Sequence, residues 1–265
     1  MNGDALPDGF GSGFWSTGTT LKPSDIIKII APQDINDRWS LVGMKAWPGQ
    51  KDRYIVVACS TKATPDSNND QANSCSYTEN PRNKIIVAVL DYDGSGLPTL
   101  AAKPYIEKMM TSDIMGRVEN IKGDTFAKSA FYLKNDQDQV VVGDLQRLDF
   151  AHYQLNSQIL AFGIRLGVNT GYSGGYVSDQ SMTLFAIIEG KVCPVLKVNT
   201  YHFENIAGEW HEDGTRDHDI SEKEYVLSIL PHQTNGFSDI KRTQKGARNK
   251  KGKIYRWDSQ KLSYQ

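Results

Sequence analysis

The chain has 265 residues, of which 39% are hydrophobic and 23% are charged, so it holds enough apolar material for a core and is not a disordered protein. Lys and Arg number 30 against 31 Asp and Glu, and this near-neutral balance excludes the dense positive field of a non-specific nucleic-acid binder. No apolar run approaches the roughly 18–20 residues that span a bilayer.

The sequence predicts one β-rich body preceded by a flexible N-terminal arm. Residues 1–20 are glycine-rich and form the expected arm, and residues 21–265 form the body, with a subdomain break near the polar stretch 112–124. Residues 1–4 lack the basic and apolar regions of a secretory signal. They fit either a cytoplasmic start or a mature secreted chain, and membrane association would require a processed N-terminus outside this chain.

Short runs rich in β-branched and aromatic residues predict strands separated by Gly, Asn, Asp and Pro turns. In chain order these runs cover 39–47, 53–59, 84–90, 126–133, 139–142, 158–166, 182–188 and 192–198. Candidate helices are few and short: 24–30, 105–110 and 221–230, and the last fits a strand equally well. The predicted fold class is mostly β, with antiparallel sheets.

Three segments share the pattern strand, tight polar turn, strand: 87–100, 184–196 and 253–264. Similar hairpins at unequal spacing indicate a propeller-like fold or a stacked β-sandwich. An ordinary antiparallel meander explains them equally well, so these alternatives stay open.

The cysteines favour an oxidising compartment. Cys59 ends an apolar run and Cys75 follows a very polar loop, so a disulfide between them would hold that loop at a gain of about 3 kcal/mol. Cys193 is then a buried free thiol. The alternative is three free thiols in a cytosolic protein.

Two polar segments are candidates for calcium. Asp91, Asp93 and Ser95 alternate as in a calcium loop, although the closing glutamate of a full EF-hand is missing and a simple hairpin turn explains them too. The segment 211–219 contains two histidines and several carboxylates. Its candidate ligands are Asp213, Asp217 and Asp219, joined by Glu222, the first glutamate after the segment.

The same 211–222 cluster suits imidazole and carboxylate ligation of a transition metal, as in a metal-dependent hydrolase. It lacks the helical HExxH spacing, so a solvated acidic loop is the simpler interpretation. Residues 204–224 hold eight acids and two bases, whereas 240–256 hold eight Lys and Arg and no acid. The basic run fits an exposed hairpin loop or an anion-binding patch.

The segment 169–179 joins two strong strands and is rich in Tyr, Ser, Gly and Asn, the composition of adaptable contact loops. Tyr172, Ser173, Tyr176 and Asp179 are therefore the predicted partner contacts. A plain strand connection is the alternative.

No catalytic signature is present. The chain has no P-loop and no strand-linked GxGxxG, and neither member of the Cys59–Cys75 pair is placed as an activated nucleophile. We therefore expect a protein that is not an enzyme and that needs no cofactor, with calcium as the one candidate ligand.

The C-terminal half resembles bacterial envelope proteins that include immunity proteins of type VI secretion phospholipase effectors. The matching stretches are 148–155, 171–176, 184–196, 213–216, 230–239 and 255–258. The resemblance implies a periplasmic immunity protein that neutralises a cognate lipase or phospholipase toxin by occluding its active site. Its motifs are turns and strands, so it transfers no site residue.

The leading hypothesis is thus a non-catalytic periplasmic toxin inhibitor. One alternative is the metal-dependent hydrolase built on 211–222. The other is an envelope module that binds glycan or lipid, which requires exposed tryptophans among Trp15, Trp39, Trp47, Trp210 and Trp257.

Overall fold

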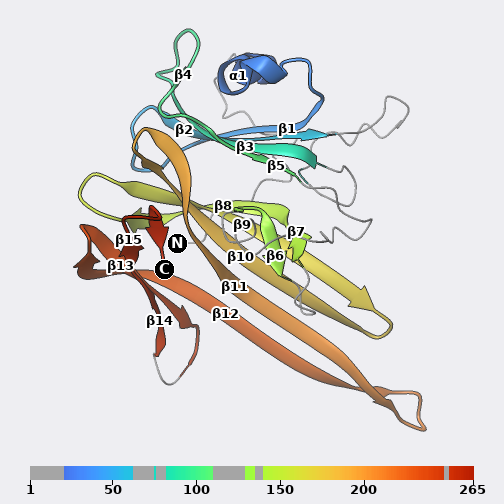
Figure 1. Cartoon of the computed structure of the whole chain (residues 1–265). Helices are drawn as coiled ribbons and strands as arrows, with labels where there is room; N and C mark the ends of the chain where they lie inside the picture. Colours follow the sequence, from blue (N-terminus) through green and yellow to red (C-terminus); the bar gives the residue numbers. More distant parts are fainter. Residues whose placement is uncertain (1–20, 62–74, 76–81, 110–128, 135–139, 248–250) are drawn as a thin grey trace.

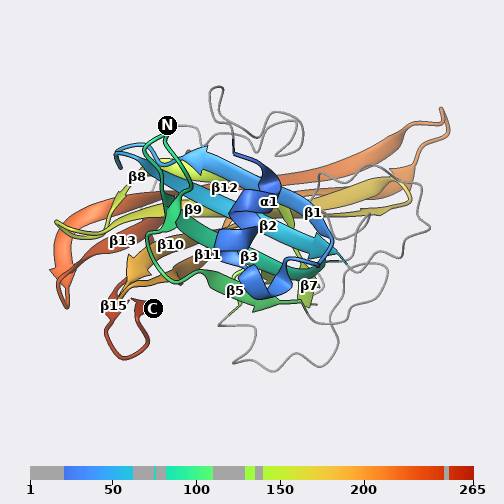
Figure 2. The same ribbon diagram turned by 90° about the horizontal axis from the view of Figure 1, so that it is seen from above.

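The computed structural model describes residues 21–61, 75, 82–109, 129–134, 140–247 and 251–265. Two antiparallel sheets, one of five strands and one of seven, face each other, and a helix covers the outer side of the smaller sheet (Figures 1 and 2). The predicted mostly-β, antiparallel class is confirmed. The flexible arm and the subdomain break predicted at 1–20 and 112–124 lie outside the described residues.

The smaller sheet has the order β1-β2-β3-β4, with β5 also paired to β3. Its elements are α1 (Pro23–Ile30), the 3₁₀ turn η1 (Pro32–Asp34), β1 (Trp39–Ala46), β2 (Arg53–Thr61), β3 (Arg82–Asp91), β4 (Thr99–Leu100) and β5 (Tyr105–Lys108). Strand β3 is fully buried from Ile85 to Leu90, because it has strands on both sides and both of its faces are covered. This explains its continuous apolar run.

Helix α1 confirms the predicted helix 24–30 and buries Ile26, Ile27 and Ile30 against the sheet. The predicted helix 105–110 is wrong over its described part. Residues 105–108 form β5, in which Ile106 pairs with Ile86 of β3, so the sheet edge overrides the weak helical pattern.

The larger sheet is a meander in which each strand pairs with the next. Its strands are β8 (Asp144–Gln154), β9 (Leu160–Tyr172), β10 (Gly175–Ile188), β11 (Lys191–Trp210), β12 (Arg216–Thr234), β13 (Phe237–Gln244) and β14 (Gly252–Tyr255). The two-stranded pairs β6–β7 (Tyr132–Lys134, Val140–Val142) and β15–β16 (Trp257–Asp258, Ser263–Tyr264) complete the fold.

The hairpin predicted at 184–196 is β10–β11. Its turn residues Glu189 and Gly190 have φ of 49° and 73°, the left-handed pair that matches strand twist in a two-residue turn. The pairing Leu90↔Leu100 likewise confirms a hairpin within 87–100. Of the two options for 221–230, the strand is correct, because the segment lies within β12.

An aromatic layer joins the two sheets. The rings of Trp47 and Phe162 meet edge-on with centroids 5.1 Å apart, Tyr105 meets Phe185 at 5.5 Å, and Phe162 stacks on Phe185 at 5.8 Å. Since these contacts connect β5 and the end of β1 to β9 and β10, the described part of the chain has the stacked-sheet arrangement and not the blades of a propeller.

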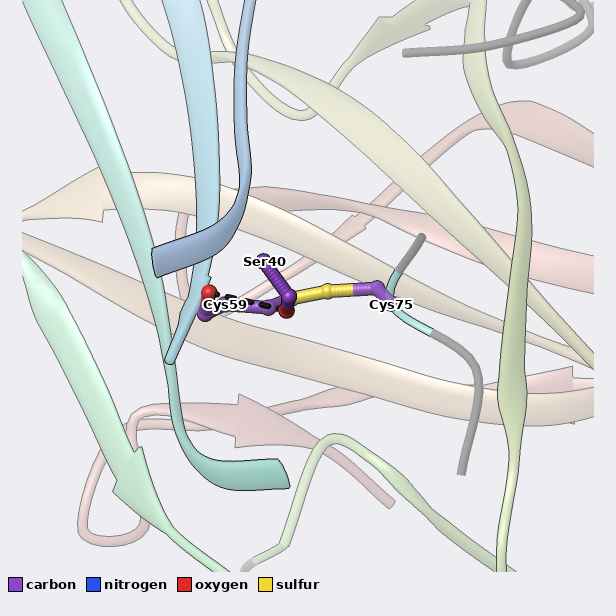
Figure 3. The surroundings of a disulfide bond; sticks show 3 residues. All are labelled: Ser40, Cys59 and Cys75. Atoms are coloured by element: carbon purple, nitrogen blue, oxygen red, sulfur yellow. Dashed lines mark hydrogen bonds between the residues drawn. A yellow bond between two sulfur atoms is a disulfide. The ribbon is translucent and has the colours of Figure 1, made fainter. Parts of the chain in front are cut away.

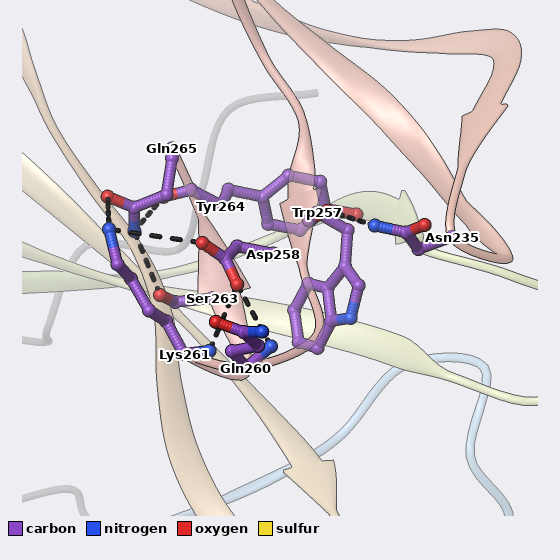
Figure 4. Close-up of polar contacts among 8 residues, drawn as sticks. All are labelled: Asn235, Trp257, Asp258, Gln260, Lys261, Ser263, Tyr264 and Gln265. Atoms are coloured by element: carbon purple, nitrogen blue, oxygen red, sulfur yellow. Dashed lines mark hydrogen bonds and ion pairs between the residues drawn. The ribbon is translucent and has the colours of Figure 1, made fainter.

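A second core lies under the C-terminal end of the chain. Phe237 stacks on Trp257 with centroids 3.9 Å apart, and the Tyr264 hydroxyl donates to the Ser238 carbonyl at 2.8 Å. Figure 4 shows how Asn235 adds a hydrogen bond to the Trp257 carbonyl at 3.0 Å. These contacts hold the last residues onto β13.

A buried polar link also connects the sheets. The Glu107 carboxylate of β5 accepts hydrogen bonds from the hydroxyls of Tyr105 and Ser129 and from the Ala130 N–H. From the other sheet, the Lys197 ammonium donates to the carbonyls of Ser129 and Tyr132 at 3.0 and 3.3 Å. The 129–132 segment is therefore fixed from both sides.

The predicted disulfide is present between Cys59, inside β2, and Cys75, with Cα atoms 5.8 Å apart (Figure 3). Both residues are buried, and the Ser40 hydroxyl donates to the Cys59 carbonyl at 3.2 Å. The bond therefore anchors position 75 directly to the core of the smaller sheet. Cys193 is a free, half-buried thiol, and burial raises its pKa.

Replacing both disulfide cysteines, Cys59→Ala with Cys75→Ala, is expected to lower the free energy of unfolding by about 3 kcal/mol, because the unfolded chain regains the freedom of the closed loop. Urea unfolding with and without dithiothreitol measures this. Reductant should destabilise the wild type and leave the double variant unchanged. An equal effect of reductant on both proteins would contradict the assignment.

Burial lowers the pKa of the Lys197 ammonium to about 8, from 10.5 in the unfolded chain. Between these values the unfolded state binds more protons than the folded state, so stability is expected to rise with pH. Urea unfolding of wild type and Lys197→Met is measured at about pH 7.5, 8.5 and 9.5. As the pH rises, the free energy of unfolding of the wild type should increase relative to that of the variant. The exposed Lys191→Met is the matched control, and parallel profiles for all three proteins would refute the prediction.

Candidate functional site

The hairpin of β11 and β12 extends beyond the rest of the sheet. On one side the pairing with β10 ends at Tyr176↔Asn205, and on the other the pairing with β13 begins at Tyr225↔Gln244. Within the described part of the chain, residues 206–223 are therefore a ribbon whose strands pair only with each other. We call these residues the arm, and Figures 1 and 2 both show it projecting past the two sheets.

A tight turn closes the arm. Gly214 has φ of +80°, and the Asp213 carboxylate accepts from the backbone N–H and the hydroxyl of Thr215 at 2.9 and 2.7 Å. These hydrogen bonds lower the pKa of Asp213. The tip is thus a side-chain-stabilised turn, the structure that Asp and Gly favour.

Further contacts fix the tip. The Arg216 guanidinium lies over the Trp210 ring at 5.2 Å and donates from Nε to the Gly208 carbonyl at 2.8 Å. The His211 Nε2 lies 2.9 Å from an oxygen of Asp217. Trp210 remains 67% exposed, which places a large apolar ring in solvent at the end of the arm.

An exposed aromatic patch lies where the arm leaves the sheet. Tyr176 stacks on Phe203 with ring centroids 4.9 Å apart, and Tyr176 is 44% exposed. Asn205 pairs with both Tyr176 and Ile220, and opposed residues share a face, so Ile220 continues the patch along the arm. We call Tyr176 and Phe203 the aromatic patch, and Ile220 is the exposed apolar residue beside it on the arm.

The structure places the predicted partner contacts unequally. Tyr172 ends β9, Ser173 is exposed in the β9–β10 turn, and Tyr176 belongs to the aromatic patch. Asp179 does not join them. It lies three residues further along β10 on the opposite face, and its carboxylate is 2.7 Å from the His202 Nδ1.

The first calcium candidate, formed by Asp91, Asp93 and Ser95, makes the contacts of an ordinary turn. Asp91 pairs with Arg53 at 3.0 Å, and an oxygen of Asp93 accepts from the N–H and hydroxyl of Ser95 at 2.9 and 2.8 Å. These Ser95 bonds lower the pKa of Asp93.

The second candidate is spread over the arm. Asp219 pairs with Ile206 and Glu222 pairs with Phe203, which puts them on opposite faces, while Asp213 and Asp217 are engaged at the tip. Among the described residues, no three His, Cys, Asp or Glu side chains gather as a metal site. The cluster expected for the hydrolase is therefore not assembled, and calcium binding stays a prediction.

The tryptophans give a mixed result for the glycan- or lipid-binding alternative. Trp47 and Trp257 are in the core, Trp39 is half-buried and Trp210 is exposed. Trp15 lies outside the described residues. No helix in the described part combines the length and apolar character needed to cross a membrane.

The arm itself is what sequence reasoning missed. The segment 211–219 is predicted as an acidic loop, whereas only residues 211–215 form a turn and β12 begins at Arg216, paired with the end of β11. Phe203 was missed as a surface residue for the same reason. The available signal is the isolated apolar residues Phe203, Ile206 and Ile220 set among charges on both sides of the Asp213–Gly214 turn, which is typical of an exposed two-stranded ribbon.

Gly174→Ala is expected to detach the β9–β10 turn from the arm. A Cβ there would lie 2.4 Å from the Arg216 Nη1 and 3.1 Å from the Ala207 Cβ, at a φ of +86° that disfavours side chains. Amide hydrogen exchange should become faster in the arm. Gly171→Ala is the matched control, since its Cβ meets no atom within 4 Å, and equal exchange in both variants would contradict the contact.

Comparison of the chain with protein-family models, with curated proteins and with solved structures finds no match. The resemblance to immunity proteins therefore stays a prediction from the sequence. The function has to be argued from the arm and the aromatic patch.

Proposed function

We propose that this chain is a non-catalytic binding protein that uses the aromatic patch and the arm to cover a site on a partner protein. The observation that carries the proposal is the stack of the exposed Tyr176 on the half-buried Phe203 beside the projecting arm. Together with the sequence resemblance, it supports a periplasmic immunity protein whose partner is a secreted toxin of the lipase or phospholipase class.

Aromatic rings on a rigid sheet suit this role. Tyr and Phe present large contact areas at a small entropic cost, and they dominate the binding energy of many interfaces. Here the ladder of β10 and β11 fixes both rings before any partner arrives. The patch is therefore preorganised, which lowers the cost of binding.

The arm adds reach. Its tip holds Trp210 in solvent, fixed by Arg216 and by the turn at Gly214. A narrow, stiffened ribbon can enter a cleft that a flat surface cannot. Such a shape suits the occlusion of an enzyme's active site.

The compartment is supported by the disulfide. Cys59 and Cys75 are bonded in the core, and disulfides persist where the environment is oxidising. An extracytoplasmic location follows as part of the proposal, and the periplasm is the compartment in which an immunity protein would meet a secreted toxin.

Capture with the tagged chain from its source cell, followed by a phospholipase assay on the captured protein, tests the proposal. Stoichiometric addition of the chain should abolish the partner's activity. Tyr176→Ala with Phe203→Ala should weaken inhibition on the order of a hundredfold or more, because the central aromatic contacts are lost.

The matched control is Leu97→Ala, which removes an exposed apolar residue in the loop between β3 and β4 and should leave inhibition unchanged. A partner whose activity is unaffected by the chain would refute the inhibitor function. Equal inhibition by the double variant and the wild type would refute the aromatic patch as the contact.

A further inference from the structure

The outer edge of β12 is unpaired along the arm. On this side, the last backbone contact in the described part is the bond from the Lys245 N–H to the Glu224 carbonyl at 2.8 Å. From Arg216 to Lys223 the strand has no described neighbour except β11. Such an edge exposes a row of N–H and C=O groups that another strand can extend.

The direction of these groups follows from Glu224. Its carbonyl points away from β11, and in a strand alternate residues point their backbone groups to the same side. His218, Ile220 and Glu222 are therefore the residues whose N–H and C=O groups face outward.

We propose that two copies of this chain pair through this edge as an antiparallel, two-fold symmetric dimer centred on Ile220. Each Ile220 would exchange N–H···O=C bonds with its counterpart, and His218 would do so with Glu222 of the second copy. The two larger sheets would join into one. A closed two-fold contact of this kind is the commonest form of homo-oligomer.

The side chains of the edge are self-complementary about Ile220. Antiparallel pairing about this residue places Asp217 opposite Lys223, His218 opposite Glu222 and Asp219 opposite Ser221. The pairing ends before Glu224, because the outward carbonyl of Glu224 already accepts the Lys245 N–H. No pair sets like charges against each other. Opposite charges across a strand pair stabilise it, whereas like charges destabilise it.

The neighbouring registers lose this match. Centring the pair on Asp219 would set the two Asp219 carboxylates against each other. Centring it on Ser221 would set Ile220 against Glu222. The register centred on Ile220 avoids both of these mismatches.

The exposed apolar residue also fits. Ile220 is 61% exposed and lies in the middle of an otherwise charged edge. Charges usually protect an edge from pairing, but a central isoleucine does not. In the dimer the two Ile220 side chains would lie beside each other and shield one another from water.

The dimer does not depend on the proposed toxin-inhibiting function. It uses the backbone edge of β12, whereas the proposed partner contact uses the face that carries Tyr176 and Phe203 together with the arm, so Ile220 belongs to both surfaces. The tests below measure dimer formation without the partner and so distinguish the two proposals.

A cysteine cross-link tests the register. In a hydrogen-bonded antiparallel pair, opposed Cα atoms are about 5.5 Å apart, within the range of a disulfide. Ile220→Cys, made in a Cys193→Ser background of the full chain, should form a covalent dimer on oxidation. Lys223→Cys is the matched control, because its two copies would be about 20 Å apart.

Charge reversal tests the same pairing in solution. Sedimentation of the wild type over a concentration series should show a species of twice the 29.6 kDa chain mass, weakened by added salt. Lys223→Asp should raise the dimer dissociation constant on the order of tenfold, and adding Asp217→Lys should restore it.

Several results would overturn the dimer. They are a monomer at all concentrations, cross-linking of the Lys223→Cys control as readily as of the Ile220→Cys protein, and failure of the double charge swap to restore association. A wild type that stays monomeric while a captured partner protects the β12 amides from exchange would assign the edge to that partner and likewise refute the proposal.

Discussion

The contact between the two sheets through Trp47, Phe162 and Phe185 determines which parts of the larger sheet are buried. The smaller sheet covers mainly β8 to β10, and the C-terminal strands cover the opposite face near β13. The strands β11 and β12 are longer than either covering layer. What remains uncovered at their ends is the arm, so the candidate binding region is a geometric consequence of how much of the sheet the two cores reach.

An isolated two-stranded ribbon is marginal in water. The arm is continuous with a seven-stranded sheet, so its pairing register is set at the root by Tyr201↔Glu224 and the residues beyond it. At the tip, Asp213, Thr215 and Arg216 hold the turn with side-chain bonds. Order is thus imposed from both ends, which lets the middle carry charged and exposed residues that add little stability themselves.

The buried charges serve the fold and not the candidate site. Asp149 is almost fully buried, binds Arg165 through oxygen–nitrogen distances of 2.7 and 2.8 Å and accepts a further bond from the Ala151 N–H. Lys84 similarly pairs with Asp34 and Asp37. Each lies on the body of a sheet or at its margin, and neither pair belongs to the arm. Losing one partner would leave a buried charge uncompensated, so these pairs specify the fold strongly.

The strand composition, the hairpin turns and the Cys59–Cys75 pairing could be predicted from the sequence, because each depends on local propensities or on one short loop. The long contact loop predicted at 169–179 is wrong, because β9 runs to Tyr172 and β10 begins at Gly175, which leaves residues 173–174 as the turn. Local patterns misjudged residues 105–108, where pairing with β3 decided the outcome, and they placed Asp179 with Tyr176 although strand alternation separates them.

The sequence by itself determined the fold class, the Cys59–Cys75 pair and the complementary order of polar residues from Asp217 to Lys223. Only the tertiary structure decided that these residues lie on a free strand edge and that Phe203 stacks under Tyr176 at the surface. The physical reason is that burial of a strand depends on which layers reach it. That reach is set by packing between residues far apart in the chain, and no local pattern encodes it.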